Sequence, residues 1–186
     1  MRRIPTLLLG ALALLAACQG TRPLYPTGLY RTAGDFRLHR PALAGFRAGR
    51  VPLARKLYVR TAPGEHQKVP LDSLWGYAGA DHEAFRVYQR GTYQIEQVDT
   101  VVVYSRHKGK NIHYYFSAGL AGPVIQLSSH KLKQAFASNP TFLRLLKQRR
   151  WYQSLDATQS PAGAPKAYRL VALYRQSLGL PASAAR

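Results

Sequence analysis

Short runs of apolar and polar positions dominate the chain from residue 51 onward. Many runs alternate at every second position, and residues that favour turns separate them, which is the pattern of β-strands joined by tight connections. The predicted turns are Pro63-Gly64, Arg90-Gly91 and residues 107–110. The expected strands lie at 55–61, 68–77, 84–89, 92–97, 101–106, 111–117 and 124–127. Their spacing predicts an antiparallel sheet or a small barrel.

Helical periods follow the last predicted strand. One helix is expected from about residue 129 to Phe136, and Asn139-Pro140 supplies an N-cap and a first-turn proline for a second helix to about residue 152. A third, amphipathic helix is predicted over 165–178, with Gly179 at its end. The expected fold class is therefore α+β, mainly β, with a small antiparallel sheet or barrel followed by C-terminal helices.

Changes in composition divide the chain into segments. Residues 18–50 contain prolines, glycines and arginines that interrupt every strand or helix period, so a tether is predicted there. Its arginines are expected to lie near anionic headgroups, and a solvated linker with incidental charge is the alternative. A β-rich domain with closing helices is expected over 51–153, a linker over 154–164, and an amphipathic helix with a tail over 165–186.

The first residues have the layout of a secretory signal peptide. Arg2 and Arg3 precede an apolar segment over 4–15, and small residues lead to Cys18, the only cysteine. The apolar run is too short for a membrane anchor, which needs about 20 residues. Bulky Leu15 disfavours an ordinary Ala-x-Ala cleavage site. A buried helix with a core cysteine is the remaining alternative.

Leu15-Ala16-Ala17-Cys18 resembles the lipobox of bacterial lipoproteins. The resemblance implies a signal peptide over 1–17, cleavage before Cys18, and a diacylglyceryl thioether on its sulfur. Gln19 resembles the residue that permits export to the outer membrane. The expected location is therefore the cell envelope, as a periplasm-facing outer-membrane lipoprotein with the membrane as a partner through acylated Cys18.

The central block also carries a resemblance. Its segments 68–77, which reads KVPLDSLWGY, and 114–117, which reads YYFS, are similar to stretches in bacterial envelope proteins of unknown function. That resemblance implies no activity and no catalytic residue.

The charge of the chain is strongly positive. Lys and Arg number 27 against 8 Asp and Glu, giving a formal net charge of +19, and after Thr100 the only carboxylate is Asp156. Such a surface attracts phosphate-bearing partners. For an exported chain the expected partners are an anionic lipid, lipopolysaccharide, an acidic glycan or an envelope protein, and no nucleic acid is expected. An arginine bias without any partner is the alternative.

Candidate catalytic and metal-binding residues are few. Residues 81–83, which read Asp-His-Glu, form the densest titratable cluster, but neighbours on a strand point to opposite faces and a solvated turn explains them. Ser117, Ser128 and Ser129 lie near His113 and His130 in sequence, but there is no Gly-x-Ser-x-Gly elbow. No histidine has the spacing of a metal motif. No catalytic residue, metal or cofactor is predicted, and a small periplasmic hydrolase is the alternative function.

Tyrosines and arginines recur in the predicted strands. Aromatic platforms beside arginines bind sugars or lipid headgroups, whereas the ordinary preference of tyrosine for half-buried strand positions explains the same pattern without a ligand. Trp75 is predicted to be a core anchor, because aromatic side chains bury a large apolar area. The predicted binding residues are Arg86, Tyr88, Arg90, Tyr104, Arg106 and Tyr115.

Overall fold

The structure is a computed structural model, and it describes residues 25–44, 56–60, 66–148, 154–159 and 167–181. The predicted signal peptide over 1–17 and the lipidation site Cys18 lie outside these ranges. None of the helices in the described ranges has the length and hydropathy that a bilayer crossing requires.

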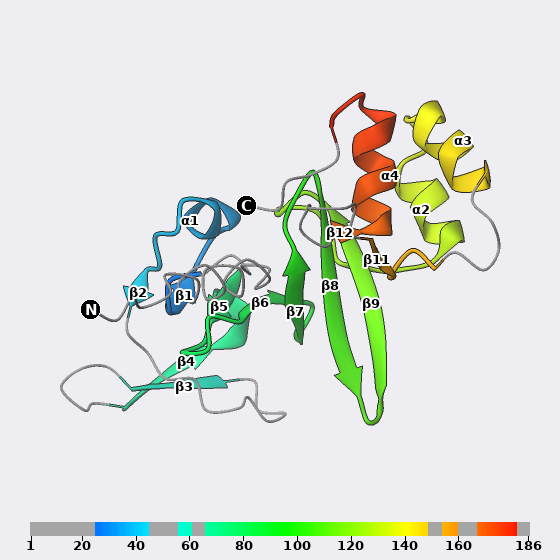
Figure 1. Ribbon diagram of the computed structural model, residues 1–186. Helices are drawn as coiled ribbons and strands as arrows, with labels where there is room; N and C mark the ends of the chain where they lie inside the picture. Colours follow the sequence, from blue (N-terminus) through cyan, green and yellow to red (C-terminus); the bar gives the residue numbers. More distant parts are fainter. Residues whose placement is uncertain (1–24, 45–55, 61–65, 149–153, 160–166, 182–186) are drawn as a thin grey trace, which may run out of the picture.

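An antiparallel, open sheet of eight strands forms the centre of the fold (Figure 1). Its order is β10-β9-β8-β7-β6-β5-β1-β2, so β5 to β10 follow the chain and the N-terminal strands complete one edge. The predicted α+β, mainly β class is confirmed, with a sheet and not a closed barrel. The strands are β1 (Gly28–Tyr30), β2 (Leu43–Ala44), β5 (Gly76–Ala78), β6 (Ala84–Tyr88), β7 (Gly91–Gln97), β8 (Val101–Lys108), β9 (Asn111–Ala118) and β10 (Ile125–Gln126).

The predicted tether over 18–50 is wrong for the part that the structure describes. Residues 25–44 form β1, the short helix α1 (Ala33–Arg37) and β2, and β1 pairs with β5. Helix α1 begins with a capping box, in which Thr32 and Asp35 each accept a hydrogen bond from the other's backbone N–H. A Cβ on Gly28 would lie 2.5 Å from the carbonyl oxygen of Leu43 in β2, so this glycine permits the close approach of the two strands.

A separate hairpin, β3 (Lys56–Arg60) with β4 (His66–Pro70), leads into the 3₁₀ turn η2 (Leu71–Ser73). Its buried Leu57 and Val59 join a core cluster with Tyr77 of β5 and Val87 of β6. The hairpin therefore covers one face of the N-terminal half of the sheet.

Three helices close the other half: α2 (Ser129–Ala135), α3 (Pro140–Gln148) and α4 (Arg169–Ser177). The predicted caps are confirmed, because Ser128 accepts from the N–H of Lys131 and Asn139 accepts from that of Phe142. The predicted linker over 154–164 contains β11 (Thr158–Gln159), which pairs with β12 (Ala167–Tyr168), and α4 begins later than the expected residue 165. The helices pack on Val101, Val103 and Phe116 of β8 and β9.

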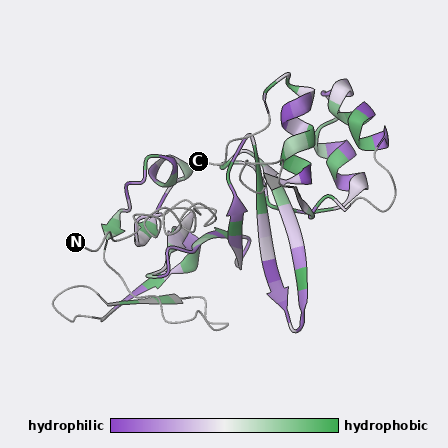
Figure 2. Cartoon of the chain, in the orientation of Figure 1, coloured by the Kyte–Doolittle hydropathy of each residue, from purple (hydrophilic) through white to green (hydrophobic). Residues whose placement is uncertain are grey.

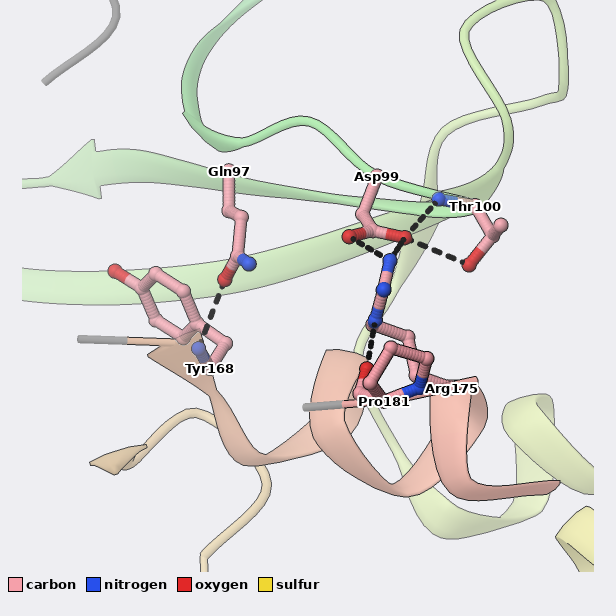
Figure 3. A network of polar contacts seen from close by, with 6 residues as sticks. All are labelled: Gln97, Asp99, Thr100, Tyr168, Arg175 and Pro181. Atoms are coloured by element: carbon pink, nitrogen blue, oxygen red, sulfur yellow. Dashed lines mark hydrogen bonds and ion pairs between the residues drawn. The ribbon is translucent and has the colours of Figure 1, made fainter. Parts of the chain in front are cut away.

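Polar contacts attach α4 to the connection between β7 and β8 (Figure 3). Arg175 Nη1 donates to both carboxylate oxygens of Asp99, at 3.2 and 3.0 Å, and its Nε donates to the carbonyl of Pro181 at 2.9 Å. At the start of the helix, the N–H of Tyr168 donates to Oε1 of Gln97 at 2.8 Å. These contacts fix both ends of α4 against the sheet, while the tip of the β8–β9 hairpin extends beyond it and is hydrophilic (Figure 2).

Candidate functional site

The sheet face opposite the C-terminal helices gathers arginines and aromatic rings. Cross-strand pairing places Arg86 opposite Tyr93, and Tyr104 opposite Tyr115. Arg106 lies on the same face as Tyr104, because the two are separated by one residue of β8. We call this surface the arginine–aromatic face; its residues are Trp75, Arg86, Tyr88, Tyr93, Tyr104, Arg106 and Tyr115. The described strand residues of this face include no Asp or Glu.

Arg86 is the most unusual residue of this face. Its side chain is only 5% exposed, and its guanidinium lies 4.7 Å from the centre of the Trp75 ring and 5.8 Å from that of Tyr88. Nη2 donates to the carbonyl of Gly122 at 3.3 Å, whereas Nε and Nη1 have no hydrogen-bond partner. A buried cation without an anionic partner is costly, so an anion bound at this face would offset part of the cost of burying the Arg86 charge.

Arg106 supplies a second, more accessible cation. Its guanidinium lies 5.4 Å from the centre of the Tyr93 ring, and it is partly exposed. Gly91 leaves room for it, since a Cβ there would lie 3.1 Å from Nη1 of Arg106. Tyr93 in turn packs edge-on against Tyr115, with ring centres 4.9 Å apart. Within the described ranges, neither arginine of this face forms an ion pair.

The loop over 119–124 covers the inner part of the face. Trp75 Nε1 donates to the carbonyl of Leu120 at 3.1 Å, next to the bond from Arg86 to Gly122. Trp75 is 9% exposed and packs against Phe36 of α1, which confirms the prediction that it anchors the core. Trp75 and Arg86 thus form the floor of the face and also hold the loop that covers it.

Five of the six predicted binding residues share this face, but at different depths. Tyr104 is fully buried, and its hydroxyl lies 2.8 Å from Oγ of Ser117. Burial raises the pKa of Tyr104, while the hydrogen bond to Ser117 and both the charge and the side-chain contact of Arg86 act in the opposite direction. Tyr115 is also buried, and Arg90 lies apart, exposed in the β6–β7 turn. Tyr104 and Tyr115 therefore support the face and do not form its surface.

Tyr93 and Trp75 belong to the face although neither is among the predicted binding residues. The position of Tyr93 could have been predicted from the sequence, because the hairpin between β6 and β7 sets which residues lie opposite each other. With the turn at residues 89–90, one position earlier than predicted, Tyr93 falls opposite Arg86. The position of Trp75 depends on pairing between β5 and β6 and carries no comparable local signal.

A groove of about 480 Å³ lies at the edge of the sheet formed by β9 and β10. It brings together His113, Ser128, Ser129 and Asp156, which are the residue types of a hydrolytic site. Their contacts are structural, since Ser128 caps α2 and Asp156 accepts a hydrogen bond from Ser154. Ser117 lies elsewhere, with its hydroxyl bonded to the carbonyl of Gly119 in the core.

The acidic cluster over 81–83 is a turn between β5 and β6. The Asp81 carboxylate accepts from the N–H of Glu83 at 3.2 Å, and His82 has a positive φ of 61° with Nδ1 3.1 Å from the carbonyl of Tyr25. These contacts agree with a structural turn.

No family model matches the chain, and no curated protein or solved structure matches it either.

Proposed function

We propose that this protein is a lipid-anchored cell-envelope protein without catalytic activity, and that it binds an anionic ligand at the arginine–aromatic face. The observation that carries the proposal is Arg86, which is buried with two unpartnered donors on a face without carboxylates. Arg106 and Tyr88 form the accessible part of the site, and Arg86 lies at its floor. The hydrolase alternative has no comparable support, because Ser117 and Ser128 have structural partners.

The chemistry of the site favours a phosphate-bearing headgroup. Guanidinium groups form short, charge-assisted hydrogen bonds with phosphate oxygens, and the neighbouring tyrosine and tryptophan rings offer apolar area for the sugar or acyl part of such a molecule. Anionic phospholipid and lipopolysaccharide share this chemistry, and both fit the envelope location that the lipobox implies.

The test compares variants of the protein purified without its lipid. Arg106→Gln should weaken binding to phosphatidylglycerol vesicles or to lipopolysaccharide at least about tenfold, because a hydrogen bond to a charged group contributes roughly 1.5–3 kcal/mol and about 1.4 kcal/mol corresponds to a factor of ten. Arg144→Gln is the matched control, since Arg144 is exposed on α3 behind the sheet. Zwitterionic vesicles should not bind, and rising salt should weaken binding of the wild type.

The variant Arg86→Met distinguishes a role of Arg86 in ligand binding from a role in the stability of the fold. Replacing an uncompensated buried cation by an apolar side chain of similar length is often neutral or stabilising, so the variant should keep its melting temperature and lose affinity. A large loss of stability with unchanged binding would assign Arg86 to holding the 119–124 loop and would contradict the proposal.

A further inference from the structure

Strand β9 is paired along only part of its outer edge. β10 is short and pairs with Tyr115 and Phe116, after which the N–H of Leu127 donates to the carbonyl of Tyr114 at 2.9 Å. The chain then turns away into α2, whose N-cap is Ser128. The first residues of β9, which pair with β8 on the inner side, lie beyond the residues that pair with β10.

The free part of this edge centres on Ile112. In an antiparallel strand, residues two positions apart direct their N–H and C=O groups toward the same neighbour. Because the carbonyl of Tyr114 points toward β10, the backbone groups of Ile112 point the same way, where none of the described strands pairs with them. The Ile112 side chain is 48% exposed and lines the groove described above.

We propose that an extended, acidic segment of a partner protein binds here as an added strand beside the first half of β9. Its backbone continues the line of β10 and bonds with Ile112, and its apolar side chains contact Ile112 and Leu127 in the groove. Adding a strand to an open sheet edge is a recurring mode of peptide recognition. This site lies at the sheet edge, apart from the arginine–aromatic face, and is a second binding function.

Charge selects the acidic partner. Exposed lysines adjoin the lining residues in sequence, with Lys110 just before β9 and Lys131 two residues after Ser129, and Asp156 is the only carboxylate that lines the groove among the described residues. An open edge with an exposed isoleucine is also a hazard for aggregation that proteins usually cover or charge. The positive charges discourage pairing with a second copy of the same edge, while they attract an acidic strand.

The probe is an acetylated, amidated peptide with the sequence Glu-Val-Glu-Val-Glu, and its counterpart with lysine in place of glutamate is the charge control. Amide hydrogen exchange of the full mature protein should show protection of Ile112 when the acidic peptide is added. Ile112→Pro removes the outward N–H, which an edge strand tolerates, and should weaken binding at least tenfold. Ile112→Thr keeps the N–H and should bind within about threefold of the wild type.

Several results would overturn the proposal. They are equal binding by Ile112→Pro and Ile112→Thr, unchanged exchange at Ile112 with saturating acidic peptide, or equal binding of the lysine peptide. A concentration-dependent dimer that protects Ile112 without peptide would assign the edge to a second copy. The exchange measurement on the wild type remains decisive if the proline variant does not fold.

Discussion

Several phenols are held away from solvent in this protein, and their ionisation links stability to pH. Burial raises the pKa of Tyr77 to about 12 and that of Tyr25 to about 12, with a smaller contribution from Tyr30 to the latter. Burial also raises the pKa of Tyr168, where Glu96 adds to the effect. In the unfolded chain these groups ionise near pH 10. The folded state therefore binds more protons than the unfolded state between about pH 10 and 12.

We predict that the free energy of unfolding does not change through ionisation of these tyrosines below about pH 9 and falls steeply as pH rises from about 10 to 12. One pKa unit corresponds to about 1.4 kcal/mol, so Tyr77 alone should remove up to about 3 kcal/mol across this window. Urea unfolding at a series of pH values measures the decline, and Tyr77→Phe should reduce it. A wild type equally stable at pH 8 and 12 would contradict the prediction.

The sequence predicts most residues of the arginine–aromatic face as binding residues but not how deeply each one is buried. The recurrence of tyrosine and arginine in the predicted strands selected Arg86, Tyr88, Tyr104, Arg106 and Tyr115 as binding residues, and the structure places these five on one face. This recurrence could not give their depth, because α1 and the loop over 119–124 cover the face from distant parts of the chain. Burial of Arg86 is therefore a tertiary property that no local pattern contains.

Among the elements, the hairpin between β6 and β7 turns through two strained residues. Gln89 and Arg90 have positive φ values of 44° and 63°, in the region that side chains with a Cβ disfavour. Two-residue hairpin turns with this conformation prefer Asn-Gly. The sequence predicted the turn at Arg90-Gly91, because Gly91 is the usual turn residue, whereas Gly91 is the first residue of β7.

We predict that Arg90→Gly stabilises the protein by about 1 kcal/mol, since relief of left-handed strain outweighs the extra entropy of glycine in the unfolded chain. Urea unfolding measures the change. Gly109→Ala is the opposite control, because Gly109 has a φ of 61° and open space around it. This variant should lower the free energy of unfolding by a similar amount through backbone strain alone. A destabilised Arg90→Gly beside a neutral Gly109→Ala would show that φ does not govern these turns.

The N-terminal elements were missed for two different reasons. β1 has three residues and is held by pairing with β5, a contact between distant segments that composition does not reveal. Helix α1 did carry a local signal, the Thr32-x-x-Asp35 capping box, but the surrounding prolines and glycines obscured it. The periodicity of apolar residues does not predict a short element that is held by pairing with a distant segment.

For the whole molecule, this correction changes the expected distance from the membrane. Tyr25 is buried in the same cluster as Phe36 and Trp75, so the folded domain includes Tyr25 and does not start near residue 51. Only residues 19–24 separate Tyr25 from Cys18. At about 3.5 Å per fully extended residue, the seven residue steps from Cys18 to Tyr25 span at most about 25 Å. If Cys18 carries lipid, the domain therefore lies close to the bilayer, where a face that binds anionic headgroups would meet them.

Cys18 is the predicted attachment site of the lipid anchor. We expect mass spectrometry of the mature protein to find an N-terminus at Cys18 with a diacylglyceryl thioether and an acylated amine. Each buried methylene contributes about 0.8 kcal/mol, so several acyl chains hold the protein on the membrane with slow release. Cys18→Ala should move the protein to the soluble fraction or leave its signal peptide uncleaved. Inserting about ten residues after Cys18 should keep the lipid anchor. It should weaken the contact of Arg106 with the anionic membrane, because the domain can then lie farther from the bilayer. A wild-type protein that is unmodified, soluble and begins at another residue would refute the lipobox interpretation, while the Arg106 and Ile112 tests would remain valid.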